Sequence, residues 1–182
     1  SMYTENARII RMDGQTLHGA LVNKVIQSKI VDMPSTILKV TLYLGNIDIR
    51  HHLGRRPNPI EAMRERVEEY VKVAAQIQTE RKVQVELVAP LPIEDESRKI
   101  PKTGGYKGTP YFGTWSLRSN LSEAMTEELC LACRKHKFKF YEHPEHFWTG
   151  DGHLSFNVME KPQSVHIRPA EYRLLQEGKS WK

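Results

Sequence analysis

Two kinds of hydrophobic pattern alternate along this chain, and this alternation constrains its fold more than any other feature. Short runs rich in β-branched and aromatic residues predict strands at 37–44, 83–89 and 138–141. Between these runs, apolar residues at steps of three and four predict helices. Strands separated by helices pair in parallel through right-handed crossovers. The sequence therefore predicts an α/β fold with a three-layer, doubly wound and mostly parallel sheet of the flavodoxin-like kind.

Helix start signals place the predicted helices. Asn58-Pro59-Ile60-Glu61 combines a capping side chain, a proline at the first helical position and an acid in the first turn. A similar signal at Asn120 and Glu123 predicts a second long helix that ends near Lys135. The remaining predicted elements are a short strand at 7–12, a helix at about 15–28 and a closing helix at 170–176.

Length and charge limit the class of protein. With 182 residues, 39% of them hydrophobic, the chain suffices for one buried core, so we expect a single domain over 1–182. The net charge of +5 favours an anionic partner, either phosphate, carboxylate or acidic glycan, and is modest for nucleic acid. No apolar run has the length of a membrane helix, and the first residues lack a signal-peptide pattern. We expect a cytoplasmic protein with no membrane partner.

The cysteines and the histidines downstream of them resemble a metal-site pattern only in part. Cys130 and Cys133 are the only cysteines, and His136, His143 and His146 follow them. Cys130, Cys133 and His136 would lie at three-residue steps on one predicted helix, whereas a structural zinc site takes its Cys-x-x-Cys pair from a turn. We therefore predict packed, reduced cysteines and no metal or cofactor, with a zinc site as the alternative.

Three segments follow predicted strands, at the edge where doubly wound sheets bind ligands: 45–56, 90–120 and 142–169. The first of them is crowded with polar groups. Arg50 can hold an anion through its planar fork, and Asp48 can orient a histidine or a substrate. The alternative is that these two side chains pair with each other or with loop backbone. The cationic residues assigned here to substrate binding are Arg50, His51 and Arg55.

Most of the second segment belongs to a long basic and aromatic stretch, 98–122. It holds five basic residues and no acidic ones, and its aromatic residues include Tyr106 and Trp115, which we assign to substrate binding. Aromatic faces with interleaved cations suit a sugar, a nucleotide base or single-stranded nucleic acid. Loops of this length are lids, binding loops or mobile segments. The alternative is that the aromatic side chains fold back onto the core.

The third segment ends in a histidine, His166, just before the predicted closing helix. Histidine suits general-base chemistry at neutral pH when another group orients it, and a structural histidine is the alternative.

Together these residues resemble the SGNH, or GDSL-like, hydrolase superfamily, especially a branch whose third block reads Gly-Glu-Ile-Asp-Cys-Arg. The corresponding residues are Gly45-Asn46-Ile47-Asp48-Ile49-Arg50. The family's closing block, Asp-x-Val-His-Leu followed by a tyrosine, is similar to Gln163-Ser164-Val165-His166-Ile167 with Tyr172 behind it. The resemblance covers most of the chain and implies an SGNH-like fold with serine esterase or acyl transferase chemistry.

The resemblance also implies roles for individual residues. In that family a serine attacks an ester carbonyl, a histidine takes its proton, and a glycine and an asparagine help to hold the oxyanion. This implies His166 as the base and Gly14 as the glycine, with Asn46 and Asp48 as further catalytic candidates. Ser1 is the only serine ahead of Gly14.

The chain departs from the family pattern at three places. Ile47 occupies the position of the asparagine that helps to hold the oxyanion, and Gln163 occupies the position of the acid that orients the histidine. No Gly-Asp-Ser block is found. We therefore expect a domain without the N-terminal strand and nucleophile block, and Asp151 and His153 are an alternative acid and base.

Two functions follow from this pattern. The first is hydrolysis or acyl transfer on a polar or anionic ester of a small molecule or glycan. The second is a catalytically inactive SGNH-like module that binds an anionic glycan, a nucleotide, a nucleic acid or a protein partner.

Overall fold

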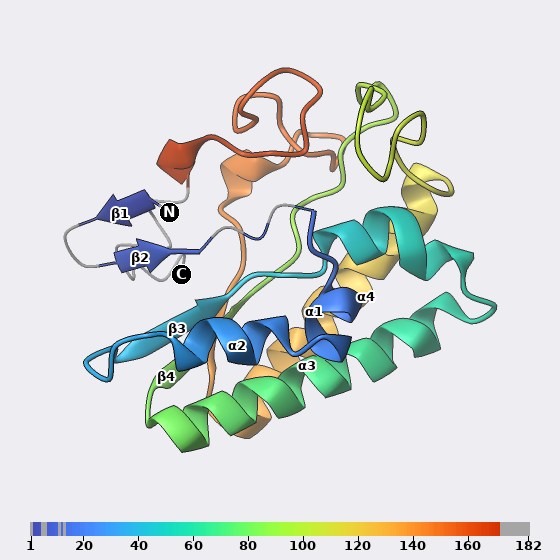
Figure 1. Ribbon diagram of the computed structural model, residues 1–182. Helices are drawn as coiled ribbons and strands as arrows, with labels where there is room; N and C mark the ends of the chain where they lie inside the picture. Colours follow the sequence, from blue (N-terminus) through green and yellow to red (C-terminus); the bar gives the residue numbers. More distant parts are fainter. Residues whose placement is uncertain (1, 5–6, 11, 13, 172–182) are drawn as a thin grey trace.

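A parallel sheet of three strands forms the centre of the fold (Figure 1), in the order β3 (Lys39–Leu42), β4 (Gln84–Val88) and β5 (Lys139–Tyr141). The computed structural model describes residues 2–4, 7–10, 12 and 14–171. Val40 is in register with Val85, and Leu87 with Phe140. The three predicted strands form, and the predicted α/β class with a parallel sheet is confirmed.

Two long helices follow β3 and β4 along the chain. The helix α3 (Pro59–Arg81) begins where its capping signal predicts, because the Asn58 side chain accepts a hydrogen bond from the Glu61 N–H. The helix α4 (Trp115–His136) begins earlier than predicted. Thr114, in extended backbone, caps it by accepting from the Leu117 N–H, so the predicted start at Asn120 is wrong. Asn120 is an exposed residue inside the helix.

The N-terminal elements are shorter than predicted. The helix expected at 15–28 is two helices, α1 (Leu17–Val22) and α2 (Val25–Val31), because Lys24 adopts a left-handed conformation between them. The strand expected at 7–12 is β2 (Ala7–Ile9), and it pairs antiparallel with β1 (Met2–Thr4) outside the main sheet. Residues 169–171 are helical, and the rest of the predicted closing helix lies outside the described residues.

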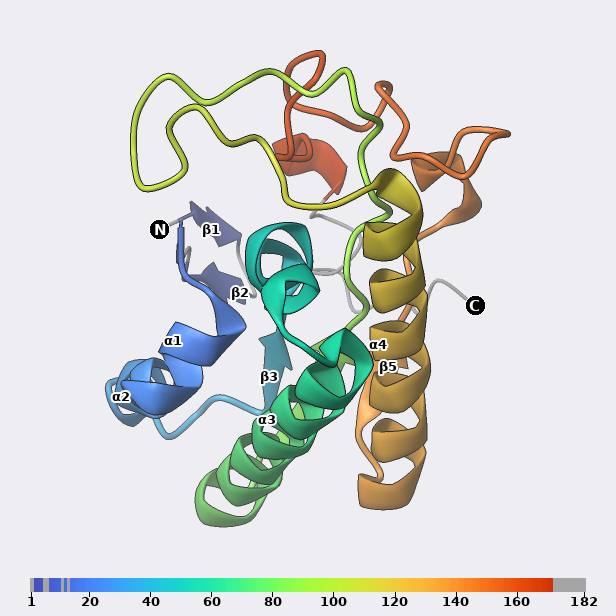
Figure 2. The ribbon, with the colours of Figure 1, turned by 90° about the vertical axis from the view of Figure 1, so that its right-hand side faces the viewer.

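The described residues form two hydrophobic clusters. On one face the helices pack over Val40, Leu42, Val85 and Leu87, with α3 and α4 side by side in front of the sheet (Figure 2). A smaller cluster includes Tyr43 and the buried residues of the short 3₁₀-helix Glu145–Phe147 and of the segment that follows it. Its buried members are Leu91, Phe147, Leu154, Val158, Met159 and Ile167. Helical segments therefore lie on both sides of the sheet. Within the described residues, no helix has the length and apolar character that crossing a membrane requires.

Candidate functional site

The three segments that follow the strands meet above the carboxyl ends of the sheet (Figure 1). Backbone hydrogen bonds join them in pairs. The Phe112 N–H donates to the Arg50 carbonyl at 2.8 Å, and the Leu154 N–H donates to the Ile93 carbonyl at 2.9 Å. The long loop after β4 therefore contacts both of its neighbours, at the edge where this class of fold binds ligands.

Arg50 pairs with a residue that the sequence did not single out, Glu94. The Arg50 Nε lies 2.6 Å from Glu94 Oε1, and Nη2 lies 3.3 Å from Oε2, so the guanidinium fork binds the carboxylate with two hydrogen bonds. Both residues are buried, at 5% and 1% exposed. Burial alone would raise the pKa of Glu94, but the charge of Arg50, its hydrogen bonds and nearby Arg98 lower it below the usual value. Glu94 is therefore ionised at neutral pH.

Two further arginines complete this buried group. The Arg98 Nη1 lies 3.3 Å from Glu94 Oε1, and burial together with the charge of Arg50 lowers the pKa of Arg98 to about 10. Arg118, in the first turn of α4, is fully buried. Its Nη1 donates to the Gly113 carbonyl at 2.7 Å, and its guanidinium carbon lies 3.9 Å from the centre of the Tyr111 ring. We call Arg50, Arg98, Arg118 and Glu94 the arginine cluster.

Asp48 fixes the start of α1. It lies in a π-helical turn, Asp48–His52, that follows β3, and it is 2% exposed. Its carboxylate accepts hydrogen bonds from the backbone N–H groups of Leu17, at 2.6 Å, and His18, at 3.0 Å. Asn46 has a comparable contact, because its Oδ1 accepts from the Leu91 N–H at 2.7 Å. Both side chains hold backbone in place, and their catalytic roles remain predictions.

Replacing Asp48 by alanine should lower the free energy of unfolding by about 2 kcal/mol, because the buried Leu17 N–H and the partly buried His18 N–H at the start of α1 lose their acceptor. Urea denaturation at neutral pH measures this loss. Asp32→Ala is the matched control, since Asp32 is exposed at the end of α2 and should change stability by less than about 0.5 kcal/mol. Equal effects of the two variants would contradict this role.

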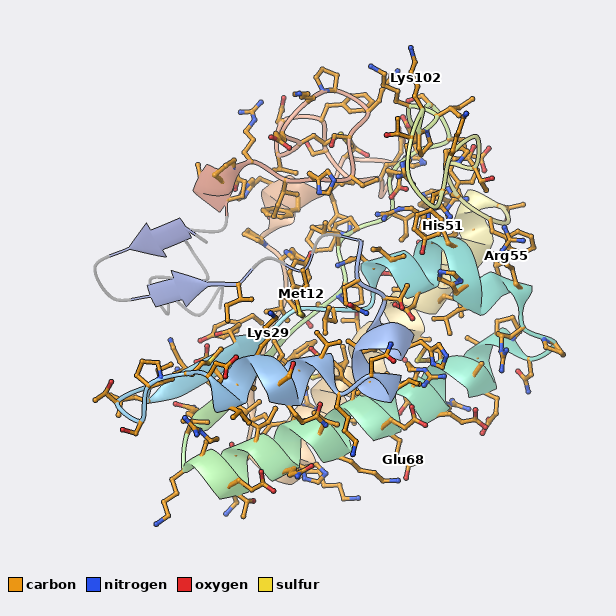
Figure 3. The ribbon with its side chains drawn as sticks, viewed as in Figure 1. Met12, Lys29, His51, Arg55, Glu68 and Lys102 are labelled. Atoms are coloured by element: carbon orange, nitrogen blue, oxygen red, sulfur yellow. The ribbon has the colours of Figure 1, made fainter. Side chains whose placement is uncertain are left out.

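The long loop is attached to the first segment through Tyr106. The Tyr106 ring stacks on buried His51 with ring centres 4.0 Å apart, and its hydroxyl lies 2.8 Å from His52 Nε2. Burial, reinforced by the charges of Arg50 and Arg98, lowers the pKa of His51 to about 4, so the imidazole is neutral at pH 7. Arg55 donates from Nε to the His51 carbonyl. Figure 3 shows His51 and Arg55 on the short helical turns below this loop.

The structure does not join His166 to the other catalytic candidates. His166 is exposed, and within the described part of the chain no hydrogen bond or ring contact links its side chain to Gly14, Asn46 or Asp48. Gly14 is exposed and has a φ of +74°, as a glycine turn allows. Ser1 and Tyr172 lie outside the described residues. The catalytic assignments therefore remain predictions.

Trp115 and His153 form a contact between the second and third segments, with ring centres 4.6 Å apart. The contact brings a predicted substrate-binding aromatic residue next to the alternative base. Asp151, the alternative acid, is exposed.

The two cysteines are free and lie on α4, as the spacing predicts. Cys133 is buried, and burial raises the pKa of its thiol to about 12, which disfavours the thiolate that zinc requires. Among the residues that the structure describes, no group of three or more His, Cys, Asp or Glu side chains is placed to hold a metal ion.

Several solved structures, including the two that follow, resemble this chain, whereas no family model and no curated protein matches its sequence. One is a GDSL-like lipase from Bacteroides thetaiotaomicron, with 13% identity and a TM-score of 0.61 over 90% of this chain and 68% of that one. The other is a protein assigned as an acylhydrolase from Bacteroides fragilis, with 15% identity and a TM-score of 0.57 over 90% and 67%. At these identities the similarity establishes a shared, SGNH-like fold.

Proposed function

We propose that this chain is an SGNH-like domain that hydrolyses a small polar ester or transfers its acyl group. The observation that supports the proposal is the position of two motif blocks on this fold. The block from Gly45 to Arg50 follows β3, and the block that contains His166 lies on the segment after β5. Both blocks therefore belong to the loop edge of a fold that is shared with a lipase and an acylhydrolase.

In the proposed reaction, a serine Oγ forms a bond to the ester carbonyl carbon while His166 accepts the hydroxyl proton. The carbonyl electrons move to the oxygen, which the Gly14 N–H and the Asn46 amide stabilise. The carbonyl re-forms as the alcohol leaves with the proton from His166. Water, or an acceptor alcohol in a transferase, then releases the acyl group by the same steps. The serine is the residue that experiment has to identify.

A second candidate function is a non-catalytic module that binds an anionic ligand. The specific observation in its favour is that the exposed His166 ring has no hydrogen-bond partner among the described residues. A general base normally needs a second group to orient it, and Gln163, at the family's acid position, is not an acid.

Hydrolysis of p-nitrophenyl acetate by the wild-type chain and by His166→Ala tests the first function. We expect His166→Ala to lower kcat/KM by about 10²–10⁴-fold, which is the range for removal of a general base. His136→Ala is the matched control, because His136 ends α4, away from the loop edge, and its loss should leave kcat/KM unchanged. Labelling by a fluorophosphonate, with mapping of the modified peptide, identifies the serine.

The outcomes separate the two functions. Absence of both turnover and labelling would contradict the esterase proposal and favour the binding module. If turnover depends on His153 and not on His166, the base is the histidine that contacts Trp115, and the assignment of His166 is overturned.

A further inference from the structure

The arginine cluster carries more positive charge than its own carboxylate can balance. The guanidinium groups of Arg50 and Arg98 contact Glu94, and the charge of Glu94 also acts on Arg118. All three arginine side chains are at least nine-tenths buried. Among the described residues, the charge of Glu96 also acts on Arg118, but the Glu96 carboxylate is exposed, so solvent screens its charge, and it accepts the Trp115 N–H at the start of α4. A buried charge without a partner is costly, so this excess predicts a counter-charge from a bound group.

The shape of the unpaired groups indicates what that counter-charge is. Arg118 Nε and Nη2 are buried and have no hydrogen-bond acceptor among the described residues. These two nitrogens form one edge of the guanidinium plane, and Arg50 uses the same edge to bind both oxygens of Glu94. An oxyanion with two oxygens at that spacing can therefore accept two parallel hydrogen bonds from Arg118.

We infer that the arginine cluster is a subsite for a phosphoryl group, with Arg118 as its bidentate donor and Arg98 as its second cation. Two of the three guanidinium charges are not balanced by Glu94, and a phosphate monoester dianion supplies two negative charges. The position of Arg118 in the first turn of α4 adds the favourable field of a helix N-terminus. A carboxylate fits the fork but leaves one positive charge unbalanced.

Entry to this subsite requires movement of the loop 95–114. The loop covers Arg118 with the Tyr111 ring, and Arg98 donates to the Pro110 carbonyl. The loop is also attached by the hydrogen bond from the Phe112 N–H to the Arg50 carbonyl and by the stacking of the Tyr106 ring on His51. Phosphate should therefore protect backbone amides of 95–114 from hydrogen exchange, since a bound anion holds the loop closed.

The inference deepens the proposed function, because it gives the ester substrate a phosphoryl group, but it is tested without turnover. Inorganic phosphate is titrated into the whole chain by calorimetry at constant ionic strength, with sodium chloride as the balancing salt. We expect saturable binding and a rise in Tm. Arg118→Met should weaken binding at least about tenfold while leaving the Tm in chloride equal or higher, since it removes a buried charge without a carboxylate.

Two further variants make the test specific. Arg118→Lys keeps the positive charge but lacks the planar fork of the guanidinium, so it should also weaken phosphate binding. If Arg118→Met does not fold, this variant still tests the role of Arg118. Arg134→Met removes the same charge from an exposed position on α4 and should leave the affinity within about twofold.

Three outcomes would overturn the inference. They are equal effects of phosphate and chloride, unchanged phosphate affinity in the Arg118 variants, and stabilisation by acetate or citrate in the absence of any effect of phosphate. Phosphate binding that depends on Arg118 in a chain without esterase turnover would mean that the subsite holds and the proposed function fails. Ester hydrolysis that depends on His166 without any phosphate binding would mean that the proposed function holds and the subsite fails.

Discussion

Glu94→Gln should lower the free energy of unfolding by about 3–5 kcal/mol, the range for removal of one partner from a buried ion pair. The Glu94 side chain is buried, and its carboxylate accepts hydrogen bonds from Arg50 and Arg98. Glutamine keeps the shape but removes the only negative charge of the arginine cluster. Its amide also places donors against guanidinium donors. Urea denaturation at neutral pH measures the effect.

A surface ion pair supplies the control for this variant. Glu128 lies 2.8 Å from Arg64 Nε across α3 and α4, where both side chains are substantially exposed. Glu128→Gln should therefore cost less than about 1 kcal/mol. The double variant Glu94→Gln, Arg118→Met should recover part of the loss, because it removes one of the unbalanced charges. Similar small losses for Glu94→Gln and Glu128→Gln would show that the cluster does not depend on its carboxylate.

The sequence predicted those parts of the fold that depend on short-range patterns. The strand runs and the cap at Asn58 involve residues a few positions apart, so their physical signal lies within one window of sequence. The predicted start of α4 is wrong because it also relied on a pattern within one short window of sequence. Asn120 and Glu123 match a capping signal, but Thr114 follows the turn at Gly113 and caps the helix first.

The candidate site depends on pairs that lie far apart in sequence. Arg50 and Glu94 are 44 residues apart, and Asp48 binds backbone groups 30 and 31 residues earlier. The sequence singled out Arg50 and Asp48 because they follow a strand, but it did not identify their partners. The available signal for Glu94 was its position as the first acid after the apolar run that ends β4, ahead of Asp95 and Glu96. Arg118 was counted only as one of five basic residues, because its burial depends on the packing of the loop 95–114.

Stability should fall as the pH is lowered from about 6.5 to about 4, because two histidines are buried in their neutral form. Burial is the main cause that lowers the pKa of both His51 and His143 from 6.5 to about 4. In this pH range the unfolded chain binds protons that the folded chain does not. Each histidine therefore contributes up to about 3 kcal/mol above pH 6.5, and this contribution is lost as the pH falls through the window. The lowered pKa of Glu94 extends the loss to still lower pH, where its carboxylate becomes protonated.

Urea denaturation at several pH values between 7 and 4 measures this slope, which should approach about 1.4 kcal/mol per pH unit for each histidine. His143→Gln removes one titrating group and keeps a donor for the Ala89 carbonyl, 2.9 Å from His143 Nε2. This variant should therefore lose about half of the slope, and His51→Gln should lose the other half. Since His51 lies under Tyr106 and beside Arg50, its protonation would also weaken the attachment of the loop 95–114. Hydrogen exchange in that loop should rise on acidification in wild type and in His143→Gln, but not in His51→Gln. An equal rise in His51→Gln would show that protonation of His51 does not control opening of the loop.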